Sequence, residues 1–128
     1  MNNPEHLRPP NRNQIVVMVV DDEVLVRNIA RIVLEVEGYF ILTAGNGEEA
    51  LEISRQYPGI IHAVLSDVQM PKMDGLELRD IILTERSGIK VLLMSGYMTA
   101  TAESIQFLQK PFGPTVLKGR IQQLLASA

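Results

Sequence analysis

The sequence predicts an α/β fold in which helices cover both faces of a doubly wound, five-stranded parallel sheet. Three observations predict this fold. Short apolar runs alternate along the chain with segments whose apolar residues recur at helical spacing. The first run, residues 15–20, is continuous and mostly β-branched, which suits a strand that is buried on both faces. Polar residues directly follow four of the apolar runs, and the carboxyl ends of parallel strands form the ligand-binding edge of such a sheet.

The composition limits the classes of protein to which the chain can belong. Its 128 residues suffice for one domain with a real core. The net charge of −3 and the lack of a Lys/Arg cluster argue against nucleic-acid binding. The absence of cysteine excludes disulfides and thiolate catalysis, and the two histidines lie too far apart in the sequence to favour a histidine metal site. No apolar run approaches the roughly 20 residues that span a bilayer, and the N-terminus lacks an apolar signal core. We therefore expect a soluble, cytoplasmic protein without a membrane partner.

The chain begins with residues 1–14, which are rich in Asn, Pro and Arg and nearly free of apolar side chains. We expect a flexible tail here, because too little apolar surface is available to offset the entropy of ordering the segment. The predicted domain spans residues 15–128. Its first strand, residues 15–20, ends at Asp21-Asp22-Glu23.

The first helix is predicted by apolar residues at helical spacing over residues 26–34, and Gly38 closes it. Three more apolar residues, Leu25, Ile32 and Val36, widen the apolar arc of this helix. Two interpretations are open. The three side chains flank the core face, which is the commoner arrangement, or they form an exposed edge that binds a partner.

The second predicted strand, residues 39–44, leads into a turn where Asn46 and Glu49 resemble a capping box that opens a helix ending near Gln56. The further predicted elements are a third strand at residues 62–65, a helix at 76–84, a fourth strand at 89–94, a fifth strand at 105–108 and a last helix that opens near Pro114. The predicted core face of the last helix consists of Val116, Leu117, Ile121, Leu124 and Leu125. Asp74 fits a turn or N-cap role before the helix at 76–84.

The polar residues at the strand ends form the constellation that carries chemistry. In a doubly wound sheet of order 2-1-3-4-5, the four strands that end in such residues are neighbours, so their side chains converge on one crevice. These side chains are Asp21 and Asp22 after the first strand, Asp67 after the third, Ser95 after the fourth and Lys110 after the fifth. Each of them alone is more often a cap, a turn residue or a solvated charge, and only their joint placement is informative.

Three crowded carboxylates raise one another's pKa unless a cation is present. Mg²⁺ suits such a site, because it prefers carboxylate, water and phosphate oxygens. Asp67 can then act as a nucleophile that forms an aspartyl phosphate. Lys110 can pair with the carboxylate and afterwards with the phosphate, and Ser95 can donate a hydrogen bond to the new phosphate oxygens.

The chain resembles the receiver domains of response regulators, the phosphoacceptor modules of two-component signalling. The resemblance covers residues 15–125 and is closest to receivers attached to hybrid sensor histidine kinases. The motifs that carry it are Val20-Asp21-Asp22-Glu23, the segment from Ser66-Asp67 through Met70-Pro71-Lys72-Met73-Asp74-Gly75, Leu93-Met94-Ser95-Gly96-Tyr97 and Phe107-Leu108-Gln109-Lys110-Pro111-Phe112.

The resemblance implies a flavodoxin-like fold and transfer of a phosphoryl group to Asp67 from a sensor histidine kinase or a histidine phosphotransfer protein. It implies Mg²⁺ held by Asp22, Asp67 and the backbone carbonyl of Gln69, with Asp21 acting largely through water. Ser95 and Lys110 match the phosphate-binding positions of the family. Phe107 matches the switch aromatic, although it lacks the hydroxyl of the tyrosine that many receivers have there. Gln69 and Tyr97 match positions that tune dephosphorylation.

The resemblance implies a signalling domain and not an enzyme. A second interpretation from another class is a receiver-like interaction module that works without phosphorylation. One departure from the family favours it: Ser95 and Lys110 are only 15 positions apart. Residues 97–104 can supply at most about two helical turns, so we expect a shortened fourth helix. In the family this helix and the fifth strand form the usual output and dimer face. We therefore expect an atypical output surface and leave the formation of a homodimer open.

Overall fold

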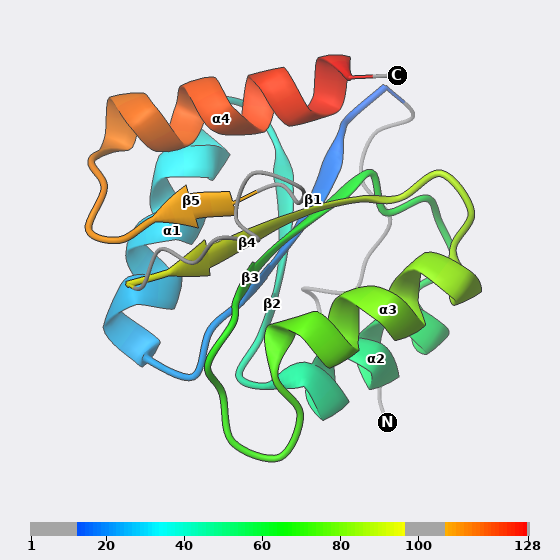
Figure 1. Ribbon diagram of the computed structural model, residues 1–128. Coiled ribbons are helices and arrows are strands. Elements are labelled where there is room, and N and C mark those ends of the chain that lie inside the picture. Colours follow the sequence, from blue (N-terminus) through cyan, green and yellow to red (C-terminus); the bar gives the residue numbers. More distant parts are fainter. Residues whose placement is uncertain (1–12, 97–106, 128) are drawn as a thin grey trace.

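The computed structural model describes residues 13–96 and 107–127 (Figure 1). A five-stranded parallel sheet in the order β2-β1-β3-β4-β5 forms its centre. The strands are β1 (Val16–Val20), β2 (Phe40–Ala44), β3 (Ala63–Asp67), β4 (Lys90–Ser95) and β5 (Phe107–Gln109). The helices are α1 (Val24–Val36), α2 (Gly47–Gln56), α3 (Gly75–Glu85) and α4 (Pro114–Ala126). The predicted doubly wound sheet and its strand order are confirmed.

Helices cover the sheet on both faces, as Figure 1 shows, with α1 and α4 on one face and α2 and α3 on the other. Successive residues of a strand point to opposite faces, so β1 supplies both core layers. Met18 packs in the layer under α2 and α3, whereas Val17 and Val19 pack in the layer under α1 and α4. All five residues of β1 and of β3 are buried, as expected for central strands of a doubly covered sheet.

Local signals fix where α2 and α3 begin. The Asn46 side chain accepts a hydrogen bond from the Glu49 N–H at 2.9 Å, which confirms the predicted N-cap. The Glu49 carboxylate accepts from the N–H of Gly45, one residue before the N-cap, so the box reaches one residue further out than the usual pattern. The Asp74 side chain accepts from the Glu77 N–H at 2.9 Å and caps α3.

The outer side of α1 is apolar and exposed. Leu25 is 72% exposed, Ile32 52% and Val36 74%, so their interpretation as the flank of the core is wrong. The core contact of α1 is narrow: Ala30 and Leu34 are its buried residues. We call the remaining apolar side the exposed α1 face, which consists of Val24, Leu25, Ile29, Ile32 and Val36.

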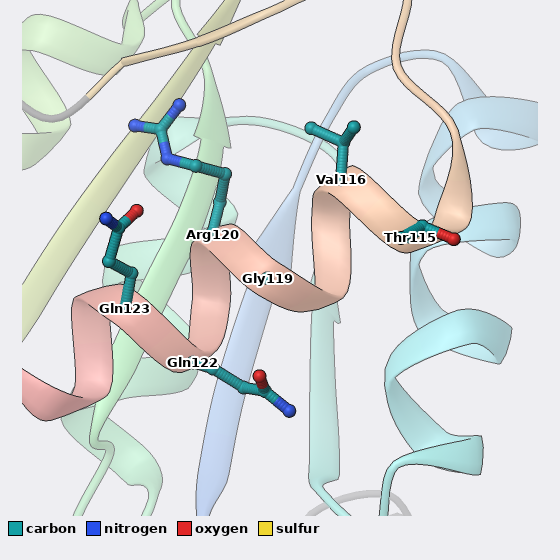
Figure 2. A pocket seen from close by; sticks show the side chains of 6 residues that line it. All are labelled: Thr115, Val116, Gly119, Arg120, Gln122 and Gln123. Carbon is teal, nitrogen blue, oxygen red and sulfur yellow. The ribbon is translucent and has the colours of Figure 1, made fainter.

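The last helix, α4, departs from its predicted core face at one residue. Leu117, Ile121 and Leu124 are buried, and Leu125 packs against the same cluster, as predicted. Val116 is 50% exposed, because a residue next to Leu117 is rotated about 100° around the helix, away from the core. It belongs to the outer face of α4, which Figure 2 shows with Gly119, Arg120 and Gln123 along a shallow depression.

Two predictions lie outside the described residues. The first is the shortened fourth helix at residues 97–104. The second is the flexible tail, of which only residues 13 and 14 are described. The fifth strand is described as Phe107–Gln109, so it extends one residue beyond the predicted end at 108, where Gln109 pairs with Ser95. Across the described part of the chain, the structure contains no helix with the length and apolarity needed to cross a membrane.

Candidate functional site

The sheet brings the predicted polar residues to its carboxyl edge. Asp21 directly follows β1, Asp67 is the last residue of β3, Ser95 is the last residue of β4 and Lys110 directly follows β5. The register fixes their mutual positions. Asp67 pairs with Met94, next to Ser95, and the Lys110 N–H donates to the Ser95 carbonyl at 2.8 Å.

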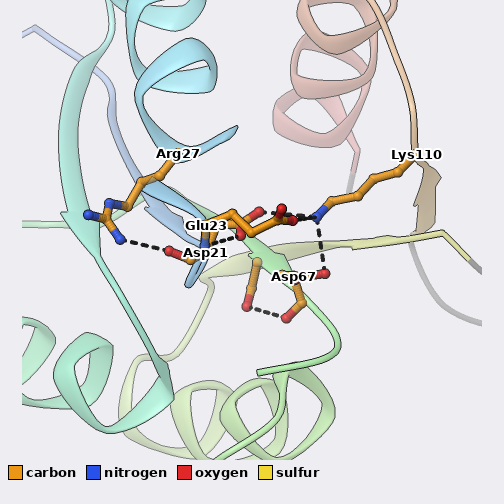
Figure 3. A network of polar contacts seen from close by, with 6 residues as sticks. Asp21, Glu23, Arg27, Asp67 and Lys110 are labelled. Carbon is orange, nitrogen blue, oxygen red and sulfur yellow. Dashed lines mark hydrogen bonds and ion pairs between the residues drawn. The ribbon is translucent and has the colours of Figure 1, made fainter. Parts of the chain in front are cut away.

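Lys110 is the cation at the centre of this edge (Figure 3). Its ammonium lies 3.2 Å from Asp21 Oδ2 and 3.4 Å from Asp67 Oδ1. The side chains of Asp21 and Asp67 are 0% and 10% exposed, so these contacts lie in a poorly hydrated environment where charges interact strongly. Lys110 therefore holds together the ends of strands β1, β3 and β5.

Burial and charge shift the acid–base properties of both partners. Burial is the largest cause that raises the pKa of the Asp67 carboxyl, and the neighbouring Asp21 and Asp22 raise it further, against the opposing effect of Lys110. Burial lowers the pKa of Lys110, but Asp21 and Asp67 more than offset this, so its pKa lies above the ordinary value. The site without a further cation thus holds more negative charge than its one ammonium neutralises.

Three carboxylates could hold a metal ion. Asp21, Asp22 and Asp67 each offer an oxygen, and these oxygens lie within 4.8 Å of one another. Mg²⁺ prefers hard oxygen ligands, and it usually binds one or two carboxylates together with water and phosphate oxygens. The donor set and the excess negative charge therefore fit the predicted Mg²⁺.

A cavity of about 450 Å³ opens over these carboxylates and is lined by Asp22, Glu23, Asp67, Gln69, Gly96 and Lys110. Gln69 is exposed at its wall, and Ser95 is 7% exposed at the end of β4. Phe107 is not brought to this cavity: its side chain packs against the core layer under α2 and α3. Tyr97 lies outside the described residues.

Gly75, the first residue of α3, allows this helix to begin in contact with the backbone of Asp67. Its N–H donates to the Val68 carbonyl at 2.8 Å. A Cβ at this position would lie 2.3 Å from the backbone oxygen of Asp67 and 3.0 Å from Val68 Cα. A real Cβ atom does not come as close to a backbone oxygen as 2.3 Å, so this position requires glycine. The segment between β3 and α3 is therefore folded tightly against Asp67, with Lys72 in the left-handed region at φ 70°.

Three contacts at the site were missed by the sequence-based prediction. The Arg27 guanidinium Nη1 donates to the Asp21 carbonyl at 2.8 Å and fixes the end of β1. The Glu23 N–H donates to Asp21 Oδ1 at 2.9 Å, and the Glu23 carboxylate lies 3.7 Å from the Lys110 ammonium. The helical spacing from Glu23 to Arg27 was a signal for the first contact, since it places Arg27 over the loop at the start of α1.

Comparisons with known proteins agree with this geometry. The family model described as "Response regulator receiver domain" matches residues 17–122. A "Probable transcriptional regulator ycf27" of Porphyra purpurea is 35% identical over 120 residues, which cover 88% of this chain and 48% of that protein. The "Sensor kinase CckA" of Brucella abortus (strain 2308) is 35% identical over 116 residues, or 85% of this chain and 12% of the kinase.

A solved structure of the response regulator protein TrrA from Thermotoga maritima, in complex with Mg(2+)-BeF, superimposes with a TM-score of 0.75 at 31% identity. It covers 87% of this chain, and this chain covers 99% of it. The chain spans about half the length of the ycf27 regulators and a small part of the kinase. With receiver motifs at the ends of β1, β3, β4 and β5 and a family model over most of its length, the chain belongs to the response regulator receiver domains of two-component systems, a family of signalling domains.

Proposed function

We propose that the chain accepts a phosphoryl group on Asp67 from a phosphohistidine, carried by a sensor histidine kinase or a histidine phosphotransfer protein, and that this changes its contacts with other proteins. The observation that carries the proposal is the placement of Asp67. Its carboxylate is nearly buried, reaches the base of a cavity and lies 3.4 Å from the Lys110 ammonium. A carboxylate in this setting is a nucleophile with a cation ready for the transferred group.

Asp21, Asp22 and Asp67, together with the backbone carbonyl of Gln69, would hold Mg²⁺. The clustered oxygens support this assignment, as does the Mg(2+)-BeF complex of the related TrrA. Bound Mg²⁺ would neutralise charge on the transferring phosphoryl group. The pKa of Asp67 is raised even beside Lys110. The added positive charge of a metal ion would lower this pKa and so favour the ionised, nucleophilic form of Asp67.

Lys110 and Ser95 would bind the phosphoryl group after transfer. Phosphorylation adds about −1.5 to −2 charges, enough to draw the ammonium away from Asp21 and toward the phosphoryl group on Asp67. Because the Lys110 N–H already binds the Ser95 carbonyl at 2.8 Å, a shift of Lys110 is passed to the end of β4. This coupling would start the switch, with Phe107 of β5, which packs against the core, as the aromatic that responds. Gln69 and Tyr97 would tune dephosphorylation. The chain promotes its own phosphorylation and dephosphorylation only, and we place it in the cytoplasm.

The exposed α1 face is suited to bind a helix of a partner protein beside the cavity. Leu25, Ile29, Ile32 and Val36 follow the spacing i, i+4, i+7, i+11, which is the pattern of a helix-packing seam. The face begins at Val24, directly after Glu23 at the cavity. We propose that the phosphodonor protein lays a helix along this face and thereby positions its phosphohistidine over Asp67.

The test is incubation with Mg²⁺ and acetyl phosphate, followed by intact-mass measurement. Wild type is expected to gain the mass of one phosphoryl group, and Asp67→Asn is expected to gain none. Asp80→Asn serves as the control, because Asp80 is an exposed carboxylate on α3 that pairs with Arg79 on the surface. A wild-type chain that gains no phosphate would support the phosphorylation-independent interaction module instead. Phosphate retained by Asp67→Asn would refute the site assignment.

A further inference from the structure

Glu23 occupies the N-cap position of α1 without capping the helix. Its backbone is extended, with φ −87° and ψ 110°, and its side chain makes no cap hydrogen bond. The backbone N–H of Glu23 donates a hydrogen bond to Asp21 Oδ1 at 2.9 Å, so the backbone of Glu23 is held by its neighbour. The side chain is therefore not required for the local helix start, and its position needs another explanation.

The Glu23 carboxylate lies at the mouth of the cavity. It is 65% exposed, and its Oε1 atom is 3.7 Å from the Lys110 ammonium, as Figure 3 shows. Asp67, by contrast, lies at the base with its side chain 10% exposed. Glu23 is absent from the cluster of three aspartates that could hold a metal ion. It is thus a fourth carboxylate of the site beside these three aspartates, and it is neither the nucleophile nor part of the metal-binding group.

The position of this charge matters because phosphoryl transfer proceeds in line. A phosphorus atom attacked by Asp67 at the base carries its leaving group on the opposite side, toward the solvent-exposed mouth. Two exposed carboxylates, Asp22 and Glu23, line this cavity, and Asp22 belongs to the possible metal-binding group. Glu23 is the one outside that group, and its carboxylate contacts Lys110 at 3.7 Å. A leaving group at the mouth would lie near the Glu23 carboxylate, which repels negative charge and attracts positive charge.

We propose that Glu23 selects phosphodonors by the charge of the leaving group, favouring donors with a protonated nitrogen over acyl phosphates. This inference rests on the proposed function of Asp67. In both reactions an Asp67 oxygen bonds to phosphorus while the bond from phosphorus to the leaving group breaks. The electron pair leaves with acetate from acetyl phosphate, or with ammonia from phosphoramidate, whose nitrogen already carries the proton. Glu23 opposes the first departure and assists the second.

The test compares the kcat/KM for phosphoramidate with that for acetyl phosphate, at saturating Mg²⁺, in wild type, Glu23→Gln and Glu52→Gln. Glu52 is an exposed glutamate of α2, so its substitution gives the same change in net charge far from the cavity mouth. Glu23→Gln is expected to lower the ratio of the two constants about five-fold, the size of effect expected for one unit charge a few ångströms away in a water-like medium. Most of the change is expected as faster reaction with acetyl phosphate. The difference is expected to shrink at about 1 M salt, where the Debye length is about 3 Å.

Three results would overturn this inference. The first is an unchanged ratio in Glu23→Gln, and the second is an equal change of the ratio in Glu52→Gln. The third is that Glu23→Gln raises the Mg²⁺ concentration for half-maximal phosphorylation as much as Asp22→Asn does, which would make Glu23 a metal-binding group. If the wild type takes phosphate from neither donor, the proposed function fails and this inference fails with it. If the wild type is phosphorylated on Asp67 and the ratio does not move, only the role of Glu23 is refuted.

Discussion

Gly75→Ala tests the packing of α3 against the phosphoacceptor strand. The added methyl group would lie 2.3 Å from the Asp67 oxygen, 3.0 Å from Val68 Cα and 3.1 Å from the Asp67 carbonyl carbon. All three are backbone atoms of the strand end and its following loop, so no side chain can rotate away to make room. Either α3 or the end of β3 must move.

The cost follows from the size of that movement. Restoring an ordinary contact needs a shift of about 1 Å. Overpacking costs typically about 1 to 3 kcal/mol, and we take the upper end, about 3 kcal/mol, because the methyl group meets backbone atoms. Alanine gains less than about 1 kcal/mol over glycine in helix propensity, which offsets only part of the cost. We expect a net loss of about 2 kcal/mol. Each kcal/mol lowers the Tm by about 4 °C in a domain of this size, so the Tm falls by about 8 °C.

The assay is thermal and urea unfolding of Gly75→Ala beside Gly119→Ala. Gly119 lies inside α4 and a Cβ there meets nothing within 4 Å, so the same substitution is expected to stabilise the protein by about 0.5 to 1 kcal/mol. Because the strain of Gly75→Ala falls on Asp67, its phosphorylation by acetyl phosphate is also expected to slow. If Gly75→Ala were as stable as Gly119→Ala, the close approach of α3 to Asp67 would be refuted.

Three further substitutions test the electrostatics, the backbone and the partner surface. Without divalent cations, Asp67→Asn is expected to raise the Tm at pH 7, because the folded state raises the pKa of this carboxyl and so disfavours its ionised form. The gain is expected to shrink as the pH falls through the raised pKa toward the ordinary value of 3.8, where the wild-type group becomes neutral as well. Lys72→Gly is expected to stabilise the protein by about 1 kcal/mol, since Lys72 has φ 70°. Leu25→Ser is expected to change stability by less than about 0.5 kcal/mol and to reduce phosphotransfer from a protein donor about ten-fold or more, without affecting acetyl phosphate.

Each of these expectations has a direct check. Unfolding curves from pH 4 to pH 8 measure the first, and a gain for Asp67→Asn that grows toward acid pH would contradict it. Lys72→Ala keeps a Cβ at the same position, so an equal gain from both substitutions would exclude backbone strain as the cause. For Leu25→Ser, a histidine kinase that phosphorylates the wild type serves as the donor, and unchanged transfer would show that this part of α1 is not in its interface.

Much of the site could be predicted from short stretches of sequence. The position of Asp67 at the end of a buried run, and of Asp21 and Lys110 at the ends of two others, required only hydrophobic patterns and the rule that parallel strands share a carboxyl edge. The N-caps Asn46 and Asp74 were equally local, because a cap is formed by residues three positions apart. These features follow from periodicity and spacing alone.

Other contacts had no local signal. Arg86 donates to Ser54 Oγ and to the carbonyls of Ser54, Tyr57 and Gly59, joining the end of α3 to the end of α2. No periodicity in either helix predicts that one guanidinium satisfies these groups. The exposure of Leu25 was left open and Val116 was wrongly predicted to be buried, because the pattern of apolar residues in a helix does not show how much of its width the sheet and the neighbouring helix cover.

The sequence by itself determined the alternation of strands and helices and the polar residues at the strand ends, since these depend on local spacing. General rules of chain connection narrowed the possible sheet orders. The tertiary structure alone decided that Glu23 lies over Lys110, that Gly75 must lack a side chain and that one side of α1 stays uncovered. These properties depend on the distance between elements far apart in the chain. That distance is set by the packing of whole side chains across the sheet, which no single stretch of sequence encodes.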